Sequence, residues 1–407
     1  MKRKNKRIVY ISQEYPYPPN GGGTIKTLNT LVTLASHYKV YAVFLCSREP
    51  SAEALKFLKR KGIQSSIVIE SKIADSVKKH ITAMIFEYLH LKPHYHYQYK
   101  SREMKRVVGG VIDKIKPTVI HIDHLNISQY LPNKKNDGQT WILEHHNIET
   151  HVYLTRLQHA RTIGQFVFLL IETIVTYMYE SMSLRRFDHI FCISQRDCRR
   201  AASWFGINNV SMQSVVYSAP MRRSRKNPRS PSIVFVGNTR WPPNEDALVW
   251  YFQSIHPQII KKNPHVLFHL VGHPNTRVLR TAARSDSNYY IHGFQKSTKL
   301  FLESSAASIL PIRSGGGVRL KALEAMSSGV PIVGTRRSME GIAVSGGHEY
   351  LNAETPIEFA NAIHRLITSS KTADEIAFLA RVHIDKYYSP RENRHFLRQY
   401  KEIIHSH

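Results

Sequence analysis

Residues 311–326 read PIRSGGGVRLKALEAM. They follow a short apolar run at 307–310 that is typical of a buried strand, and they lead into a stretch whose apolar residues have helical spacing. Glycines at the entry of a helix expose backbone N–H groups where the helix dipole is positive, which favours an anion. A strand, a glycine turn and a helix in this order indicate an α/β fold.

Lys321 and Glu324 follow these glycines three residues apart, so they lie on one face of the expected helix. An ammonium group there can neutralise a diphosphate, and a carboxylate can accept hydrogen bonds from a ribose diol. We interpret the stretch as a nucleotide-diphosphate site. The alternative is a surface Lys–Glu pair, which contributes only about 0.2–0.5 kcal/mol.

The same alternation of strands and helices extends over most of the chain, which predicts parallel sheets. The expected strands are 8–11, 39–45, 64–69, 118–123, 141–144, 189–193, 233–236, 266–271, 289–292, 307–310 and 331–333. Residues 218–232 are rich in Pro, Ser and Arg and break the pattern. We therefore expect a first domain at 1–217, a linker at 218–232, a second domain at 233–385, and a C-terminal helix at 386–407 that can cross back to the first domain.

A second glycine-rich turn, PPNGGG at residues 18–23, follows the first expected strand and precedes a helix. Glycines allow a sharp bend and a close approach of the backbone to a ligand. The turn matches neither a dinucleotide fingerprint nor a Walker A motif. A ligand loop and a plain structural turn both remain open.

The 407 residues include 57 Lys and Arg but only 30 Asp and Glu, a formal charge of +27. Such a field favours an anionic partner, which is a nucleic acid, an acidic membrane leaflet or a phosphorylated substrate. The longest apolar stretch, 166–179, is shorter than the ~20 residues that span a bilayer, so no transmembrane helix is expected. That stretch either packs inside the first domain or lies on a membrane surface.

The three cysteines are too scattered for a disulfide framework or a zinc site, and we expect inert thiols. The segment HYHYQY at 94–99 lacks Cys or carboxylate partners at ligand spacing. We expect an amphipathic surface or an acceptor-binding loop there, and no metal.

Several segments in a fixed order carry a resemblance to a known family. They are 18–23, EHHNIE at 144–149, FDHIFCIS at 187–194, GNTRWPPN at 237–244, LVG at 270–272, 314–333 and MEGI at 339–342. Together they resemble the retaining GT-B glycosyltransferases of the glycosyltransferase-4 family (glycosyl transferases group 1). This resemblance implies an α/β fold of two Rossmann-like parallel-sheet domains that face a central cleft, with the nucleotide-sugar on the second domain and the acceptor on the first.

The resemblance also implies roles for single residues. The implied catalytic residues are His124, Arg240 and Lys321, and the implied donor-binding residues are Gly22, Gly23, Asn238, Gly316, Gly317, Arg319 and Glu324. Glu324 would hold the ribose, while Lys321 and Arg240 would face the diphosphate. His146 competes with His124 for the place beside the donor sugar, and a structural histidine is the third possibility.

Two positions depart from the family pattern. The earlier of two paired glutamates is replaced by Gly316, and a basic residue shortly after Arg240 is absent, since residues 242–244 are Pro, Pro and Asn. Lys321 or Arg319 can provide the second charge. Fixed cations and helix-end amides would stabilise the departing diphosphate, so we expect no divalent metal and no other cofactor.

The expected function is therefore sugar transfer with retention, from a nucleotide-diphosphate-sugar to a glycan or lipid-linked glycan, in envelope polysaccharide or glycoconjugate assembly. The expected location is the cytoplasm, peripherally on the inner face of the membrane, with an anionic lipid surface as partner. One alternative is a GT-B nucleotide-sugar epimerase. A nucleic-acid-binding protein is the other, but the sequence has no helix-turn-helix, RNA-recognition or zinc-finger pattern, so we expect no nucleic-acid partner.

Overall fold

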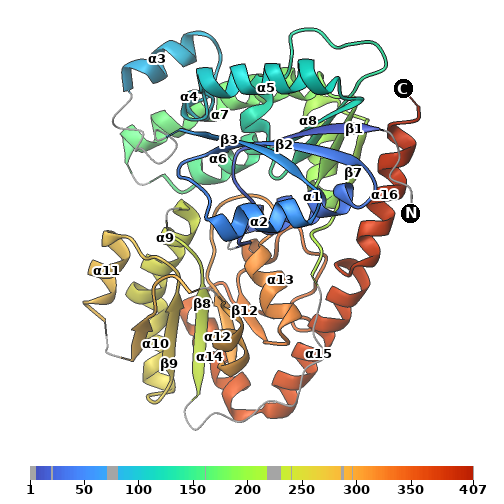
Figure 1. Cartoon of the computed structure of the whole chain (residues 1–407). Coiled ribbons are helices and arrows are strands. Elements are labelled where there is room, and N and C mark those ends of the chain that lie inside the picture. The colour runs from blue at the N-terminus through green and yellow to red at the C-terminus, as the bar shows by residue number, and fades with distance from the viewer. Residues whose placement is uncertain are drawn as a thin grey trace. The chain divides into compact units, whose positions relative to one another are not determined.

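The computed structural model describes residues 6–19, 22–70, 81–160, 162–217, 231–239, 241–285, 288–295 and 297–406. The chain divides into two compact units (Figure 1). The first unit comprises Met1–Val215 and Arg391–His407, and the second comprises Val216–Pro390. Most of the expected linker, residues 218–230, lies outside the described residues.

The first unit is built on a seven-stranded parallel sheet in the order β3-β2-β1-β4-β5-β6-β7. Its strands are β1 Arg7–Ser12, β2 Lys39–Cys46, β3 Gln64–Ile69, β4 Val119–Asp123, β5 Thr140–His145, β6 His189–Cys192 and β7 Val210–Met212. All residues of β4 and β5 are buried, as expected for central strands covered on both faces.

Helices cover both faces of this sheet (Figure 1). They are α1 Gly22–Ala35, α2 Ala52–Arg60, α3 Ile81–Leu89, α4 His94–Gln98, α5 Arg102–Ile115, η3 Leu125–Tyr130, α6 Glu149–Leu157, α7 Ile163–Leu184, α8 Gln195–Phe205 and α16 Arg391–Ile403. Met104 of α5 and Ala201 of α8 belong to the core on one face. Leu31 of α1 and Phe396 of α16 belong to the core on the other, so the C-terminal helix completes the first unit.

The second unit has a six-stranded parallel sheet in the order β10-β9-β8-β11-β12-β13. Its strands are β8 Ser232–Val236, β9 Leu267–Val271, β10 Tyr289–Ile291, β11 Ala307–Leu310, β12 Ile332–Gly334 and β13 Leu351–Asn352. Its helices are α9 Pro242–Trp250, η4 Tyr251–Ile255, α10 His256–Lys262, α11 Thr276–Ala282, α12 Lys299–Ser304, α13 Leu320–Ser327, η5 Arg336–Met339, α14 Pro356–Thr368 and α15 Ser370–Tyr387.

The predicted fold class is confirmed: each unit is a doubly wound α/β sheet with Rossmann-like strand order. In both sheets the order reverses next to the first strand, between β1 and β4 and between β8 and β11. Such a switch point leaves a crevice beyond the carboxyl ends of the strands, where α/β proteins bind ligands. In each unit, a ligand site is therefore expected at the carboxyl ends of these strands and in the loops that follow them.

One local prediction needs correction. We expected the glycines at 315–317 to open a helix, but α13 begins at Leu320. Gly315 and Gly317 have φ angles of +96° and +74°, which are not helical, so they form a loop before the helix. A non-glycine residue would be strained in this left-handed conformation.

Candidate functional site

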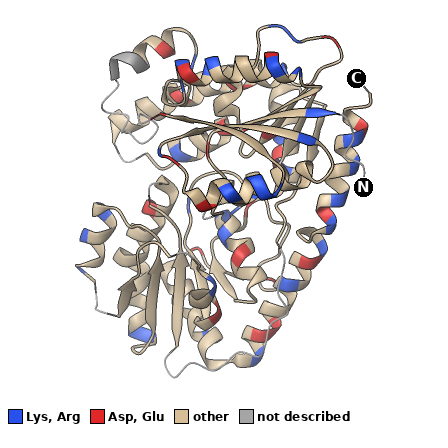
Figure 2. Cartoon of the chain, in the orientation of Figure 1, with Lys and Arg blue, Asp and Glu red and all other residues tan. Residues whose placement is uncertain are grey.

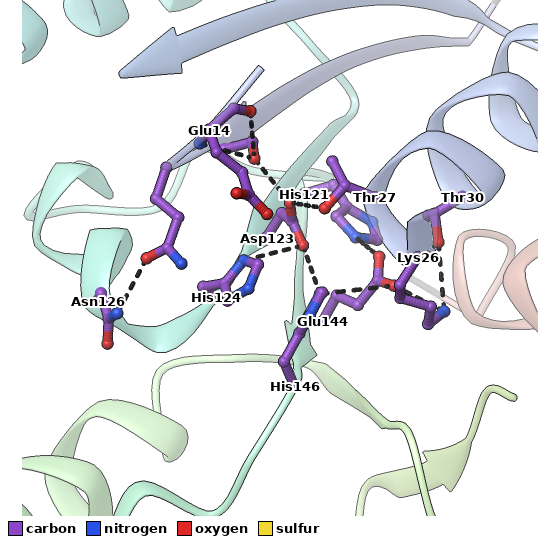
Figure 3. A network of polar contacts seen from close by, with 12 residues as sticks. Glu14, Lys26, Thr27, Thr30, His121, Asp123, His124, Asn126, Glu144 and His146 are labelled. Carbon is purple, nitrogen blue, oxygen red and sulfur yellow. Dashed lines mark hydrogen bonds and ion pairs between the residues drawn. The ribbon is translucent and has the colours of Figure 1, made fainter. Parts of the chain in front are cut away.

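In the first unit, polar residues gather where β1, β4 and β5 end (Figure 3). Asp123 is the last residue of β4, and His124 follows it with a φ angle of +79°. A positive φ is uncommon for a residue with a side chain and is retained when the surroundings demand it. The His124 amide donates to the Glu144 carbonyl oxygen at 3.0 Å, which fixes this turn against β5.

The carboxylate of Asp123 is fully buried and organises this cluster. Its Oδ2 atom accepts hydrogen bonds from Ser12 Oγ and Thr27 Oγ1, both at 2.7 Å. Its Oδ1 atom lies 2.8 Å from His146 Nε2 and 3.3 Å from His124 Nδ1. Burial alone would raise the pKa of this carboxyl, but the two histidines hold it well below its usual range.

His124 and His146 are stacked, with ring centroids 3.6 Å apart and an interplanar angle of 27°. Burial lowers the pKa of a histidine, but the neighbouring Asp123 carboxylate raises the pKa of His124 to about 9. Burial, and then the charge of His124, lower the pKa of His146. The pair therefore holds one cation, on His124, and a neutral ring stacked on it.

Glu144 is the second fully buried carboxylate of this cluster. Its Oε1 atom lies 2.6 Å from Lys26 Nζ and accepts a hydrogen bond from Thr30 Oγ1 at 2.9 Å. Its Oε2 atom lies 3.3 Å from His121 Nε2. Burial would raise the pKa of Glu144, but Lys26 and His121 hold it at about 2.

His121 and Asp123 alternate with apolar residues along β4, so they point to the same face of the sheet. His121 Nδ1 lies 3.3 Å from the Tyr400 hydroxyl of α16, and Asp123 contacts Thr27 of α1. Both contacts are to helices on the same face of the sheet.

Gly23 lies next to Glu14 and His124. A Cβ atom at Gly23 would stand 2.6 Å from Glu14 Oε1 and 3.7 Å from His124 Nε2. Burial raises the pKa of Glu14 to about 6, although the charge of His124 opposes this. Gly23 therefore lies close to His124, and any side chain at position 23 would displace Glu14.

Among the described residues, one group of three has donor atoms close enough to hold a metal ion: Asp123, His124 and His146, whose atoms lie within 4.8 Å of one another. A metal ion lies near the plane of each imidazole that binds it. The two rings are nearly parallel at 3.6 Å, so their planes do not meet at a common point near both nitrogens. This geometry suits two histidines on one carboxylate better than an ion held by all three.

In the second unit, Lys321 lies at the carboxyl end of β8. Its Nζ atom donates to Asn244 Oδ1 at 2.6 Å and stands 4.2 Å from the centroid of the Phe235 ring. Asn244 Nδ2 in turn donates to the carbonyl oxygen of Asn238 at 2.8 Å. Burial lowers the pKa of Lys321 to about 7. The charge of Glu324 opposes this shift, and an anionic ligand beside Lys321 would stabilise its ammonium form further.

Glu324 lies one turn after Lys321 on α13 and accepts a hydrogen bond from Thr298 Oγ1. Burial raises its pKa. Arg319 is 4% exposed, and its guanidinium donates to the carbonyl oxygens of Gly316 and Ser314 while it covers the Trp241 ring. Arg319 therefore stabilises the glycine loop by hydrogen bonds to the carbonyl oxygens of the loop.

The structure thus brings together His124 with Gly23 in the first unit, and Lys321 with Glu324 and the Asn238 backbone in the second. Gly22 is the first residue of α1, and Gly316 and Gly317 are buried in the loop before α13. Arg240 lies outside the described residues.

Sequence reasoning missed a set of polar residues around His124, which are the partly buried Glu14 and the buried Lys26, Thr27, Thr30, Asp123 and Glu144. The one signal that could have found them is charge in apolar strands, as in HIDH at 121–124 and LEHH at 143–146.

Two further sequence-based expectations can be placed. The histidines at 94–99 are structural: His96 Nδ1 lies 2.7 Å from Glu87, and His94 Nδ1 lies 3.0 Å from Glu172. We expected an amphipathic surface or an acceptor-binding loop here; the segment forms the short helix α4, which packs these histidines against neighbouring carboxylates. The three cysteines are free and buried, as expected.

Residues 230–369 match the family model described as Glycosyl transferases group 1. The matched residues lie within the second unit. A 44.6 kDa protein of the cps region of Klebsiella pneumoniae is 25% identical over 400 residues, covering 95% of this chain and 97% of that protein. The similarity therefore extends through both units.

Solved structures share the fold of this chain. S. aureus TarM, solved with fondaparinux, alpha-GlcNAc-glycerol and UDP, has a TM-score of 0.71 at 12% identity over 98% of this chain and 99% of that one. Sucrose-phosphate synthase from Thermosynechococcus elongatus has a TM-score of 0.72 at 12% identity over 99% and 100%. HepE from Anabaena with UDP and glucose has a TM-score of 0.65 at 12% identity over 98% and 100%. These likenesses confirm the GT-B fold.

Proposed function

We propose that the chain transfers a sugar, with retention at the anomeric carbon, from a nucleotide-diphosphate-sugar to a glycan or a lipid-linked glycan. The observation that carries the proposal is Lys321, a partly buried ammonium group at the carboxyl end of β8 that forms no ion pair among the described residues. It lies within the segment that matches the group 1 family model. The K. pneumoniae relative from a cps region supports a role in polysaccharide assembly. The UDP in the TarM and HepE structures supports a nucleotide donor.

In this proposal the second unit binds the donor. Lys321 pairs with the diphosphate, Glu324 accepts hydrogen bonds from the ribose hydroxyls, and the amides of Gly316 and Gly317 support the phosphate. Arg240 adds a second positive charge and Asn238 borders the same site. Arg319 contributes by donating hydrogen bonds to carbonyl oxygens of the glycine loop, which fixes the conformation of that loop.

The chemical step breaks the bond between the anomeric carbon and the phosphate oxygen and forms a bond from that carbon to an acceptor oxygen. The nucleoside diphosphate leaves with the electron pair, and the proton of the acceptor hydroxyl goes to the departing phosphate. Negative charge on the leaving group is larger in the transition state than in the ground state. Fixed cations beside it therefore stabilise the transition state more, and this lowers the barrier. We propose that Lys321 and Arg240 supply this charge without a divalent metal.

The first unit contributes the acceptor side and His124. This histidine is cationic near neutral pH because Asp123 raises its pKa to about 9. It can donate a hydrogen bond to a hydroxyl of the donor sugar, while His146 stays neutral and positions it. The strained backbone at His124 supports a functional role, since such strain is retained where a site requires it. The enzyme would work in the cytoplasm, against an anionic membrane surface.

A thermal-shift screen with UDP, GDP, ADP and their common sugars, with and without EDTA, tests this proposal. A ligand at 100 times its Kd adds about 2.7 kcal/mol of stability. We expect one nucleotide to stabilise the wild type equally with and without EDTA. Lys321→Ala and Glu324→Ala should lose this shift, whereas Lys371→Ala and Glu375→Ala, at exposed positions of α15, should keep it.

Loss of the shift in EDTA would contradict metal independence, and no shift with any nucleotide would contradict the donor site. Conversion of the bound sugar without an acceptor would favour the epimerase alternative instead.

A further inference from the structure

Helix α7, Ile163–Leu184, packs Leu169 and Leu184 into the core, yet it also buries polar side chains and turns a second row of large apolar ones outward. Glu172, Thr176 and Glu180 face the interior and are 0% exposed. A surface helix of a globular protein normally buries its apolar stripe and exposes its charges. By length and composition, α7 is also the one described helix that could cross a membrane.

The inward carboxylates tie α7 to the first unit. Glu172 accepts hydrogen bonds from the Tyr88 hydroxyl and from the His94 amide, the latter at 3.1 Å. Glu180 lies 2.7 Å from His145 Nε2 and accepts hydrogen bonds from the Thr150 amide and hydroxyl at 2.9 and 2.6 Å. These bonds fix the rotation of the helix, so its apolar face cannot turn inward, and they hold it in the fold rather than free to insert across a bilayer.

The outward face is an apolar strip that runs the length of the helix. Its large side chains are each at least 39% exposed: Ile163, Phe166, Val167, Leu170, Ile171, Ile174, Tyr177, Met178 and Met182. The neighbouring helix α3, which contacts α7 through Tyr88 and Glu172, adds exposed Ile85, Phe86 and Leu89. Contiguous exposed apolar patches of this kind mark surfaces that contact a membrane or a partner. We call these twelve residues the α7–α3 strip.

The charges around the strip are positive. Between residues 162 and 206 the acidic side chains of Glu172, Glu180 and Asp197 are buried, and Asp188 pairs with Lys135 at 2.5 Å. Four arginines of this segment are exposed: Arg185, Arg186, Arg196 and Arg199. Arg185 lies at the end of α7 and donates to the carbonyl oxygen of Phe205 at 3.2 Å, which joins that end to α8. Lys and Arg also prevail over the chain as a whole (Figure 2).

We propose that the α7–α3 strip lies on an anionic membrane, with its apolar side chains in the acyl–headgroup boundary and the arginines of α7 and α8 on lipid phosphates. Apart from Tyr177, whose hydroxyl already donates to the carbonyl oxygen of Trp204 at 3.1 Å, the strip consists of aliphatic, Phe and Met side chains. Such side chains offer no groups for the directional hydrogen bonds of a protein interface. A lipid layer needs none, and an apolar face bordered by Arg is what a helix in the membrane plane presents. The inference deepens the membrane part of the proposed function and does not depend on sugar transfer.

Vesicle flotation tests the inference with the full chain. The probes are vesicles of phosphatidylcholine alone and of phosphatidylcholine mixed with phosphatidylglycerol. The test variant is Phe166→Gln/Ile174→Gln. Its control, Phe378→Gln/Ile357→Gln, removes the same side chains from second-unit positions that are 66% and 64% exposed. We expect the wild type and the control to float with the anionic vesicles, and the test variant to bind at least about tenfold more weakly.

Equal flotation of test and control variants would overturn the inference. A second outcome would also overturn it: light scattering shows a dimer for the wild type and a monomer for the test variant, while the variant still binds vesicles. The strip would then join two copies of the chain. The nucleotide thermal shift of the test variant shows that it is folded. Vesicle binding by Lys321→Ala separates this inference from the proposed donor site, because that variant should lose nucleotide binding only.

A conservative variant gives an independent readout. Phe166→Trp adds tryptophan fluorescence to that of the wild type. Anionic vesicles should shift the emission of this added tryptophan to the blue. Vesicles whose acyl chains carry bromine should quench it. A tryptophan at position 166 that stays unquenched while the protein floats would overturn the assignment of the strip as the contact.

Discussion

Lys26 Nζ lies 2.6 Å from Glu144 Oε1, and the two side chains are 1% and 0% exposed. This ion pair joins the first helix of the chain to the fifth strand, beneath the histidines that the resemblance placed beside the donor sugar. Thr30 also donates to Glu144, and Gln213 donates to Thr30 at 3.1 Å, so the pair belongs to a buried network. Such a pair is costly to break because the remaining charge has no solvent.

Lys26→Met should therefore lower the free energy of unfolding by about 3–5 kcal/mol, and Glu144→Gln by a similar amount. The double variant leaves no unpaired charge, so it should be less destabilised than the sum of the two by about 2 kcal/mol. Urea unfolding of the four proteins measures this difference. Strict additivity would mean that the two groups do not stabilise each other.

The raised pKa of His124 predicts a pH dependence of stability. The pKa rises from 6.5 in the unfolded chain to about 9 in the fold, so the folded state binds the proton more tightly. The resulting stabilisation is complete below pH 6.5 and is lost as the pH rises through 9; it amounts to at most about 3 kcal/mol.

The difference in the free energy of unfolding between the wild type and His124→Gln isolates this contribution from other titrating groups such as Lys321. It should shrink as the pH rises from 6.5 to 9 in urea unfolding. The matched control, His348→Gln at an exposed loop position, should keep a constant difference from the wild type. A difference for His124→Gln that does not change with pH would assign the titration to another group.

Lys321 predicts a link between proton uptake and donor binding. Burial lowers its pKa to about 7, so at pH 8 most of the unliganded protein carries a neutral amine. A bound diphosphate raises this pKa, and binding at pH 8 should therefore take up close to one proton. The affinity for the nucleotide-diphosphate-sugar should fall as the pH rises from 7 to 9.

Isothermal titration calorimetry in buffers of different ionisation heat counts these protons. The ligand is the nucleotide-sugar that gives the thermal shift. A binding heat that is the same in all buffers at pH 8 would rule out Lys321 as the group that meets the diphosphate. Lys371→Ala should take up the same number of protons as the wild type.

Gly272 lies in contact with the loop after β8. Its φ angle is +132°, and a Cβ there would stand 2.0 Å from the carbonyl oxygen of Gly237. Gly272→Ala should lower the free energy of unfolding by about 2–5 kcal/mol, from backbone strain and from displacement of Gly237.

Gly347→Ala is the control for Gly272→Ala, because Gly347 has a φ angle of +90° with open space around its Cβ position. It should cost only the strain, about 1 kcal/mol. Urea unfolding compares the two variants. An equal loss of unfolding free energy in the two variants would show that Gly237 moves aside without cost. Gly272 would then be required only for its backbone angle.

Most strands could be predicted from the sequence, because each is a run of β-branched and apolar residues between polar turns. The exceptions were β7, Val210–Met212, and β13, Leu351–Asn352. Strands of three and two residues have too few positions to show a pattern, and their pairing is decided by the neighbouring strand. The strand order also needed the structure, since the sequence contains no signal for which strand pairs with which.

The site was predicted only in part for a related reason. His124 stands at the end of an apolar strand, where a polar residue is conspicuous. Its partners come from distant segments, as with Ser12 and Thr27 on Asp123, and no spacing in the sequence links them. The polarity of α7 was likewise hidden, because an apolar stretch of that length is typical of a core helix until its buried face is seen to carry Glu172 and Glu180.

Helix α16 has a consequence for how the protein is made. Its Phe396 and Tyr400 cover Phe191 and the face of the first sheet that also holds Tyr10 and His121. The ribosome synthesises that sheet first, then the whole second unit, and only afterwards the helix that covers it. Until translation reaches residue 391, the nascent chain exposes this aromatic face, which favours capture by chaperones and, without them, aggregation. Any truncation within the second unit therefore also leaves the first unit uncovered.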